Sequence, residues 1–114
     1  MTQRTESPSE SVATGRRAWV RYRCEQPAQL HVPDSYRCQS VTVLDLSRGG
    51  VGLLLKTPVE HGTLIQLELR DRDDTSFELT AEVKHVAQQS DGTWRCGCEF
   101  AWALSEAELQ VLLR

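Results

Sequence analysis

Residues 41–55 read VTVLDLSRGGVGLLL, and this stretch decides the fold of the chain. Two runs of β-branched and apolar residues flank a polar segment that contains a double glycine. Such runs favour strands, and the glycine pair permits a positive φ and a tight reversal. The stretch therefore predicts a hairpin between a strand over about 36–44 and a second strand over 51–55.

Further short strands are predicted on both sides of this hairpin. Apolar and polar residues alternate over 28–32, 64–69, 77–85 and 94–100, and the alternation places His85 in the same parity as Val83. Pro, Asp, Ser and Gly separate these runs as turn formers. Six short strands about ten residues apart predict an all-β fold, a six-stranded antiparallel β-barrel that is closed or nearly closed and so has no exposed edge strand.

The pattern changes at both ends of the chain. Residues 1–14 are rich in Ser, Thr and Glu and predict a disordered tail. At the other end, Ser105 and Glu108 form a capping box, which predicts a short C-terminal helix over 104–114. The 114 residues hold one domain, with the barrel over 24–102.

Four arginines and no acid lie in residues 16–23, which read RRAWVRYR. The chain has a net charge of -3, so the remainder of the chain carries -7. Arginines gathered in a mildly acidic domain favour a local anion site over a surface that coats nucleic acid, although a solvated charge run is the alternative. The arginine fork makes bidentate bonds to phosphate and to the O6/N7 edge of guanine.

Catalytic and metal motifs are not evident. The sequence has no G-x-S-x-G and no P-loop, and its three histidines are scattered singly, so we expect no enzyme. Cys96 and Cys98 have C-x-C spacing and share the parity of Trp94 and Phe100, which indicates small apolar residues on a buried face and no metal site. No apolar run suggests a secretion signal or membrane insertion, and a cytoplasmic protein is expected.

Two short motifs supply complementary recognition groups. Arg17-x-x-x-Arg21 offers two guanidinium groups for phosphates and guanine edges. Asp45-x-Ser47-x-x-Gly50, which alone is an ordinary turn, offers a carboxylate, a hydroxyl and an approachable backbone. A carboxylate accepts hydrogen bonds from the N1–H and the exocyclic amine of guanine. Together the motifs suit a guanine nucleotide with exposed phosphodiesters.

This order of motifs, followed by strands that end in Gly97-Cys98-Glu99-Phe100, resembles a PilZ domain over residues 15–114. The resemblance implies a six-stranded barrel with a C-terminal helix that binds the second messenger cyclic di-GMP. Residues 15–23 would form an arginine arm that folds over the barrel.

By this resemblance, Arg17 and Arg21 would hold phosphates and guanine edges. Asp45, Ser47 and Gly50 would receive a guanine, with Gly97 also assigned to the site. Arg16 precedes the first motif arginine, and an arginine there resembles the family members that bind a stacked pair of ligands.

The expected mechanism is that the ligand orders the arm. An unidentified effector protein then recognises the ordered arm. No cofactor is expected beside the cyclic di-GMP ligand. Two alternatives stay open. The first is a small barrel that binds single-stranded nucleic acid through aromatic stacking, which the acidic composition disfavours. The second is a PilZ-like interaction module that binds no nucleotide.

Overall fold

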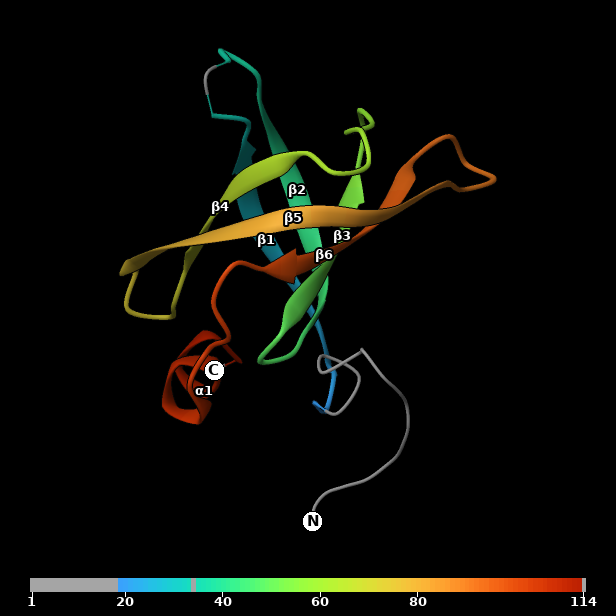
Figure 1. The fold of residues 1–114 in the computed structure, drawn as a ribbon. Helices are drawn as coiled ribbons and strands as arrows, with labels where there is room; N and C mark the ends of the chain where they lie inside the picture. The colour runs from blue at the N-terminus through green and yellow to red at the C-terminus, as the bar shows by residue number, and fades with distance from the viewer. Residues whose placement is uncertain (1–18, 34, 114) are drawn as a thin grey trace.

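The chain folds as a closed barrel of six antiparallel strands with one short helix, as predicted (Figure 1). The computed structural model describes residues 19–33 and 35–113. The barrel order is β1-β2-β3-β6-β5-β4, and β4 closes onto β1. The elements are β1 (Tyr22–His31), β2 (Cys38–Leu46), β3 (Gly50–Leu55), β4 (Leu64–Arg70), β5 (Ser76–Gln88), β6 (Trp94–Phe100) and α1 (Glu106–Leu113).

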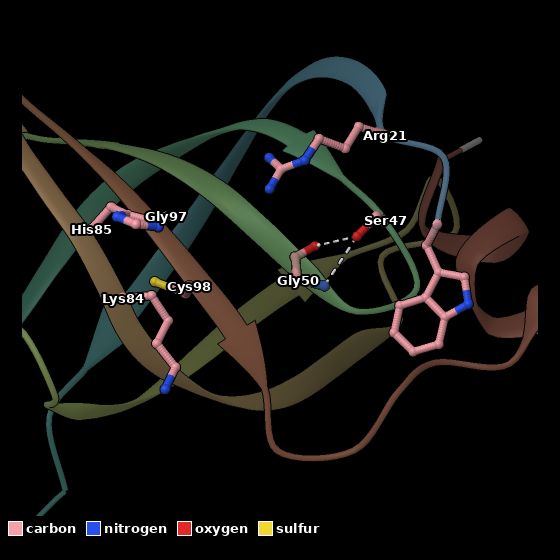
Figure 2. Close-up of a pocket in the computed structure, with 8 residues that line it drawn as sticks. Arg21, Ser47, Gly50, Lys84, His85, Gly97 and Cys98 are labelled. Atoms are coloured by element: carbon pink, nitrogen blue, oxygen red, sulfur yellow. Dashed lines mark hydrogen bonds between the residues drawn. The ribbon is translucent and has the colours of Figure 1, made fainter. Parts of the chain in front are cut away.

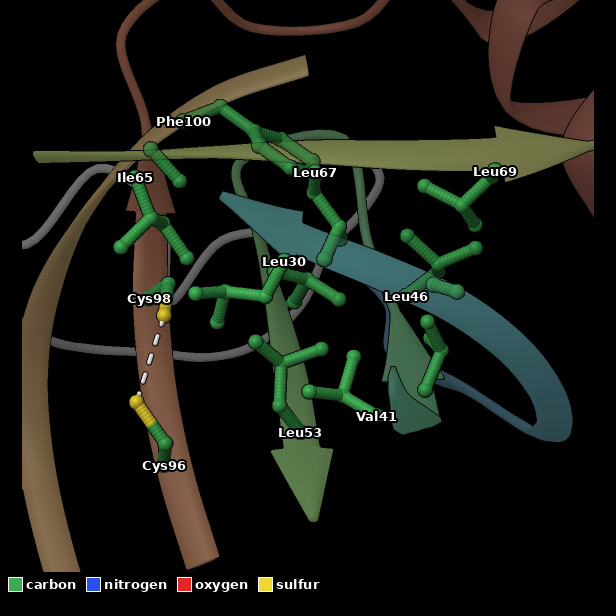
Figure 3. Close-up of a cluster of buried hydrophobic side chains, with 14 of the residues drawn as sticks. Leu30, Val41, Leu46, Leu53, Ile65, Leu67, Leu69, Cys96, Cys98 and Phe100 are labelled. Atoms are coloured by element: carbon green, nitrogen blue, oxygen red, sulfur yellow. Dashed lines mark hydrogen bonds between the residues drawn. The ribbon is translucent and has the colours of Figure 1, made fainter. Parts of the chain in front are cut away.

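Alternating side chains from every strand fill the barrel with one apolar core (Figure 3). Leu30, Val43, Leu53 and Leu67 are among its fully buried members. Helix α1 belongs to the same core, because its Leu109 and Leu112 are buried in the cluster. The helix therefore packs one face against the core from outside the strands.

Register shifts interrupt the regular strand pairing at three places: in β1 between Arg23 and Gln26, and at a β-bulge in each of β2 and β5. Leu44 is the extra residue of β2 opposite β3, and Lys84 is the extra residue of β5 opposite β6. A bulge reverses the parity of the residues that follow it. The prediction that His85 shares the face of Val83 is therefore wrong: His85 is exposed, and Val86 packs against the core in its place.

Some boundaries also differ from prediction. Strand β1 begins at Tyr22, before the predicted arm–barrel boundary at residue 24, because Tyr22 and Arg23 pair with Leu46 and Asp45. For the same reason β2 continues to Leu46, past the predicted end at residue 44. The predicted tail over residues 1–14 lies outside the described residues.

The capping box that predicted α1 is present. The Glu108 backbone N–H donates to Ser105 Oγ at 3.0 Å, and the Ser105 backbone N–H donates to Glu108 Oε1 at 2.8 Å. These reciprocal bonds satisfy two of the free N–H groups in the first turn. They start the helix just after the end of β6.

Candidate functional site

A pocket of about 290 Å³ lies on the outside of the barrel, where β1 begins and where the β2–β3 turn faces β5 and β6. Figure 2 shows Arg21, which directly precedes β1, and Lys84, from β5, approaching it from opposite sides. Its lining residues are Trp19, Arg21, Ser47, Gly50, Lys84, His85, Gly97 and Cys98. Four of the predicted site residues therefore meet at one pocket.

Ser47 holds the β2–β3 turn together. Its side chain is buried, and Ser47 Oγ accepts hydrogen bonds from the backbone N–H groups of Gly49 and Gly50, each at 3.1 Å. The Ser47 N–H in turn donates to the Gly50 carbonyl oxygen at 3.0 Å. The hydroxyl thus fixes the turn that forms one wall of the pocket.

The two glycines of the site differ in how tightly they are packed. Gly50 lies in β3 without a positive φ, so the expected need for conformational freedom does not apply to it. A Cβ at Gly50 would clash with the backbone carbonyl oxygen of Cys98 on β6. A Cβ at Gly97 would lie 3.6 Å from the His85 ring, which is ordinary contact. Gly50 is therefore required by strand packing, whereas Gly97 leaves open space at the pocket wall.

Arg21 and Asp45 form an ion pair that joins the two halves of the predicted site. Arg21 Nη1 lies 3.1 Å from Asp45 Oδ1, and Arg95 Nη2 lies 4.0 Å from the other oxygen, Oδ2. The Asp45 side chain is only 14% exposed, because Gly52 on β3 has no Cβ to displace it: a Cβ there would lie 2.8 Å from Oδ2. The bulge at Leu44 lets Asp45 face outward while Leu46 enters the core.

Lys84 brings a second positive charge to the opposite side of the pocket. Its Nζ lies 3.3 Å from Glu82 Oε1 and 3.7 Å from Glu99 Oε1. The bulge at Lys84 turns both Lys84 and His85 toward the pocket. In this state the cations Arg21 and Lys84 are both matched by carboxylates.

Trp19 forms a further wall of the pocket and contacts the turn from outside. The Arg48 guanidinium carbon lies 5.5 Å from the centre of the Trp19 ring, a cation–π distance. Arg48 Nε also donates to the Leu104 carbonyl oxygen at 2.8 Å. Arg48 therefore touches both the chain before β1 and the segment that leads into α1.

The pKa is raised for the thiols of Cys98 and Cys24 near the site, whereas the hydrogen bond with Cys98 lowers the pKa of the Cys96 thiol. Cys96 and Cys98 are buried with their Sγ atoms 3.5 Å apart, and Cys98 contributes to the pocket wall. The hydrogen bond with Cys96 and burial raise the pKa of the Cys98 thiol. Burial and the charge of Asp45 likewise raise the pKa of Cys24. Raised thiol pKa values disfavour the reactive thiolate form. Cys38, by contrast, is exposed.

A larger cavity of about 580 Å³ lies at the other end of the strands. Val59, Trp94 and Arg37 are among its lining residues, and no predicted site residue reaches it. Within 19–33 and 35–113, no group of three His, Cys, Asp or Glu side chains is placed to hold a metal ion. No described helix is long and apolar enough to cross a membrane.

Sequence reasoning found part of this pocket and missed the rest. Arg21, Ser47, Gly50 and Gly97 line it, and Asp45 is bonded to Arg21 beside it. The predicted residues Arg16 and Arg17 lie outside the described part of the chain. The residues that motif reasoning missed are Lys84, His85 and Arg95. The adjacent basic residues of β5 were the one signal for Lys84 and His85, and the bulge that turns them toward the pocket cannot be seen in the sequence. Arg95 lies on β6 and had no such signal.

A comparison with models of protein families matches residues 15–114 to the PilZ domain. The chain therefore belongs to the PilZ domain family. A comparison with curated protein sequences found no match.

Solved structures share the fold at low sequence identity. The PilZ domain of Escherichia coli YcgR with c-di-GMP has a TM-score of 0.67 at 20% identity, covering 84% of this chain and 86% of that one. The Bacillus subtilis inhibitor of motility MotI/DgrA has a TM-score of 0.67 at 16% identity, covering 85% of this chain and 48% of that one. The K. pneumonia MrkH–c-di-GMP complex has a TM-score of 0.64 at 20% identity, covering 84% and 49%. This chain thus spans about half the length of MotI/DgrA and MrkH.

Proposed function

We propose that this PilZ domain is a cyclic di-GMP receptor, a binding protein and not an enzyme. The observation that carries the proposal is the Arg21–Asp45 ion pair, which brings the two motif halves, 24 residues apart in sequence, to the edge of one pocket. Family membership supports it, as does the likeness in fold to YcgR and MrkH, whose structures contain c-di-GMP.

Ligand binding would exchange partners within this ion pair. A guanine can donate its N1–H and amine to the Asp45 carboxylate, and Arg21 is then released to a phosphate or to the O6/N7 edge. Arg21 can make this exchange at low cost because its side chain is 61% exposed, and exposed ion pairs contribute little stability. Ser47 and Gly50 would supply the wall against which the base packs.

The phosphates of the ligand need positive charge, and the cations Arg21 and Lys84 of the described pocket are already neutralised by carboxylates. We therefore assign phosphate binding mainly to Arg17, together with Arg21 once it is released. Arg16 would favour a stacked pair of ligands.

The size of the pocket supports a movable cover. Its volume of about 290 Å³ is at the lower end of small-molecule sites, which span roughly 300–1,000 Å³. A cyclic dinucleotide would be only partly enclosed, and the arm over 15–23 would be ordered across its exposed side. In the cytoplasm, a separate effector protein would then recognise the ordered arm.

Calorimetric titration with cyclic di-GMP tests the proposal. Four or five charge-assisted hydrogen bonds contribute about 1.5–3 kcal/mol each. Less the cost of ordering the arm, they leave about 8 kcal/mol, so we expect roughly micromolar affinity. The stoichiometry distinguishes one ligand from a stacked pair.

Arg21→Ala should lose most of the binding, and Arg21→Lys should lose much of it, because a point charge cannot replace the planar fork. Arg72→Ala is the matched control, since Arg72 is exposed near the β4–β5 hairpin tip, away from the pocket. Near-normal binding by Arg21→Lys would contradict the bidentate role.

Two other outcomes would replace the proposal. No heat with the folded protein would favour an interaction module that binds no nucleotide. Binding of single-stranded oligonucleotides that weakens steeply with salt would favour a nucleic-acid-binding barrel.

A further inference from the structure

Arg48 occupies a place in the fold that neither motif explains. It lies in the β2–β3 turn between Ser47 and Gly50, which both line the pocket, yet its own side chain points away to other partners. On one side is the Trp19 ring, 5.5 Å from the guanidinium carbon. On the other is the Leu104 carbonyl oxygen, 2.8 Å from Nε.

The start of helix α1 is held to the barrel at this residue. The Leu104 N–H donates to the Arg48 carbonyl oxygen at 2.8 Å, so the two residues are joined by a reciprocal pair of hydrogen bonds. Leu104 is buried and directly precedes the Ser105 cap of α1. A change in the position of Arg48 should therefore change how firmly the first turn of α1 is held to the barrel.

Trp19 connects the same residue to the pocket. It lines the pocket and stacks on Arg48, and in sequence it lies between Arg17 and Arg21. A ligand in the pocket adds contacts on the pocket side of the Trp19 ring. Those contacts favour the ring position in which it stacks on Arg48, because a ligand stabilises the conformation that it contacts best.

We propose that Arg48 is a positioning residue that couples the ligand pocket to helix α1 through Trp19 on one side and Leu104 on the other. An occupied pocket holds Trp19 on Arg48, Arg48 holds Leu104, and α1 becomes more firmly fixed to the barrel. The identity of the ligand rests on the proposed function, but the coupling between Trp19 and α1 does not need a ligand.

The coupling has a modest expected size. A cation–π pair of this kind changes an equilibrium by about two- to five-fold. By linkage, a ligand that strengthens the attachment of α1 is itself bound more tightly when α1 is attached, by the same factor. The coupling should therefore appear as a small change in how firmly α1 is attached and as an equal change in the affinity for the ligand.

The first test is a double-mutant cycle without nucleotide, read by hydrogen exchange of the α1 backbone amides, including Leu109. Trp19→Ala should raise their exchange rate about two- to five-fold, as should Arg48→Lys, which keeps the charge but has neither the planar face nor Nε. The double variant should exchange no faster than Arg48→Lys alone. If the two substitutions raised the exchange rate independently, so that their factors multiplied in the double variant, the proposal would be overturned.

A control variant separates coupling from general weakening of the helix. Ser105→Ala removes the N-cap and should raise α1 exchange by itself. Trp19→Ala should still add its full factor in that background, because Arg48 is intact. Loss of the Trp19 effect in Ser105→Ala would contradict a route through Arg48. Exchange of core amides such as Leu53 reports whether each variant is folded.

The second test adds cyclic di-GMP at saturation. α1 exchange should slow in the natural chain and stay unchanged in Arg48→Lys, with occupancy measured in the same samples. Equal slowing in both proteins would overturn the coupling. If no protein binds the nucleotide, the proposed function fails while the ligand-free cycle still decides the coupling.

Discussion

Gly50 sits where β3 passes so close to β6 that no side chain fits. Its Cβ would meet the Cys98 carbonyl oxygen, a backbone atom that cannot move aside alone. We expect Gly50→Ala to destabilise the fold by about 1–3 kcal/mol, the usual cost of overpacking. Urea unfolding, read as the shift in midpoint at constant slope, measures this change.

Gly97→Ala is the matched control for this substitution. A Cβ at Gly97 makes only ordinary contact with the His85 ring at 3.6 Å, so stability should change little. The added methyl group nevertheless enters the pocket wall and should weaken ligand binding. If both variants were equally destabilised, strand proximity would not be the reason for Gly50.

Asp45 shows how a single residue can be predicted for function and misplaced in structure. Its motif identified it as a ligand contact, and the predicted hairpin placed it in the turn. In the structure it is a strand residue, paired with Arg23 on one side and Gly52 on the other. Its carboxylate is held by neighbouring strands, so it is a fixed partner against which Arg21 can move.

At the scale of elements, the capping box makes the attachment of α1 dependent on pH. Hydrogen bonds from the Ser105 N–H, and then from its side chain, lower the pKa of Glu108. The ionised carboxylate therefore stabilises the helix above the unfolded value of about 4.3, and this contribution is lost as the pH falls through the lower folded pKa. The stability difference between the natural chain and Glu108→Gln should shrink on acidification from pH 7 to pH 3.

Thermal unfolding of both proteins across this range measures that difference. Glu106→Gln is the control, because Glu106 also lies in the first turn of α1 but does not bond to the Ser105 N–H. A pH-independent gap for Glu108→Gln would contradict the role of its ionised carboxylate.

The strands were predictable and the bulges were not. Alternation and turn residues located all six strands, because a half-buried strand leaves a period of two in the sequence. Leu44 and Lys84 are ordinary strand residues, and only pairing with β3 and β6 shows that each is extra. These two bulges aim Asp45, Lys84 and His85 outward, so the sequence predicted the motif residues but not the rest of the pocket.

For the whole molecule, helix α1 should be indispensable to the barrel. Leu109 is 1% exposed and belongs to the common core, so Leu109→Ala should cost about 2–5 kcal/mol. Val111→Ala is the control, since Val111 is only half-buried on the same helix and should cost less. Cooperative denaturant unfolding of both variants gives the comparison, and equal losses would contradict a core role for Leu109.

The pairing that closes the barrel, between β1 and β4, affects the order in which the strands form during folding. β1 and β4 meet only over Gln29–His31 and Gln66–Glu68, whereas β4 and β5 pair along the whole of β4. The seam joins segments far apart in sequence, so the chain must lose much loop entropy before it gains these few bonds. Closure of the seam should therefore come late in folding. Transient opening of the native barrel should begin there, at the end of β1 that lies farthest from Arg21.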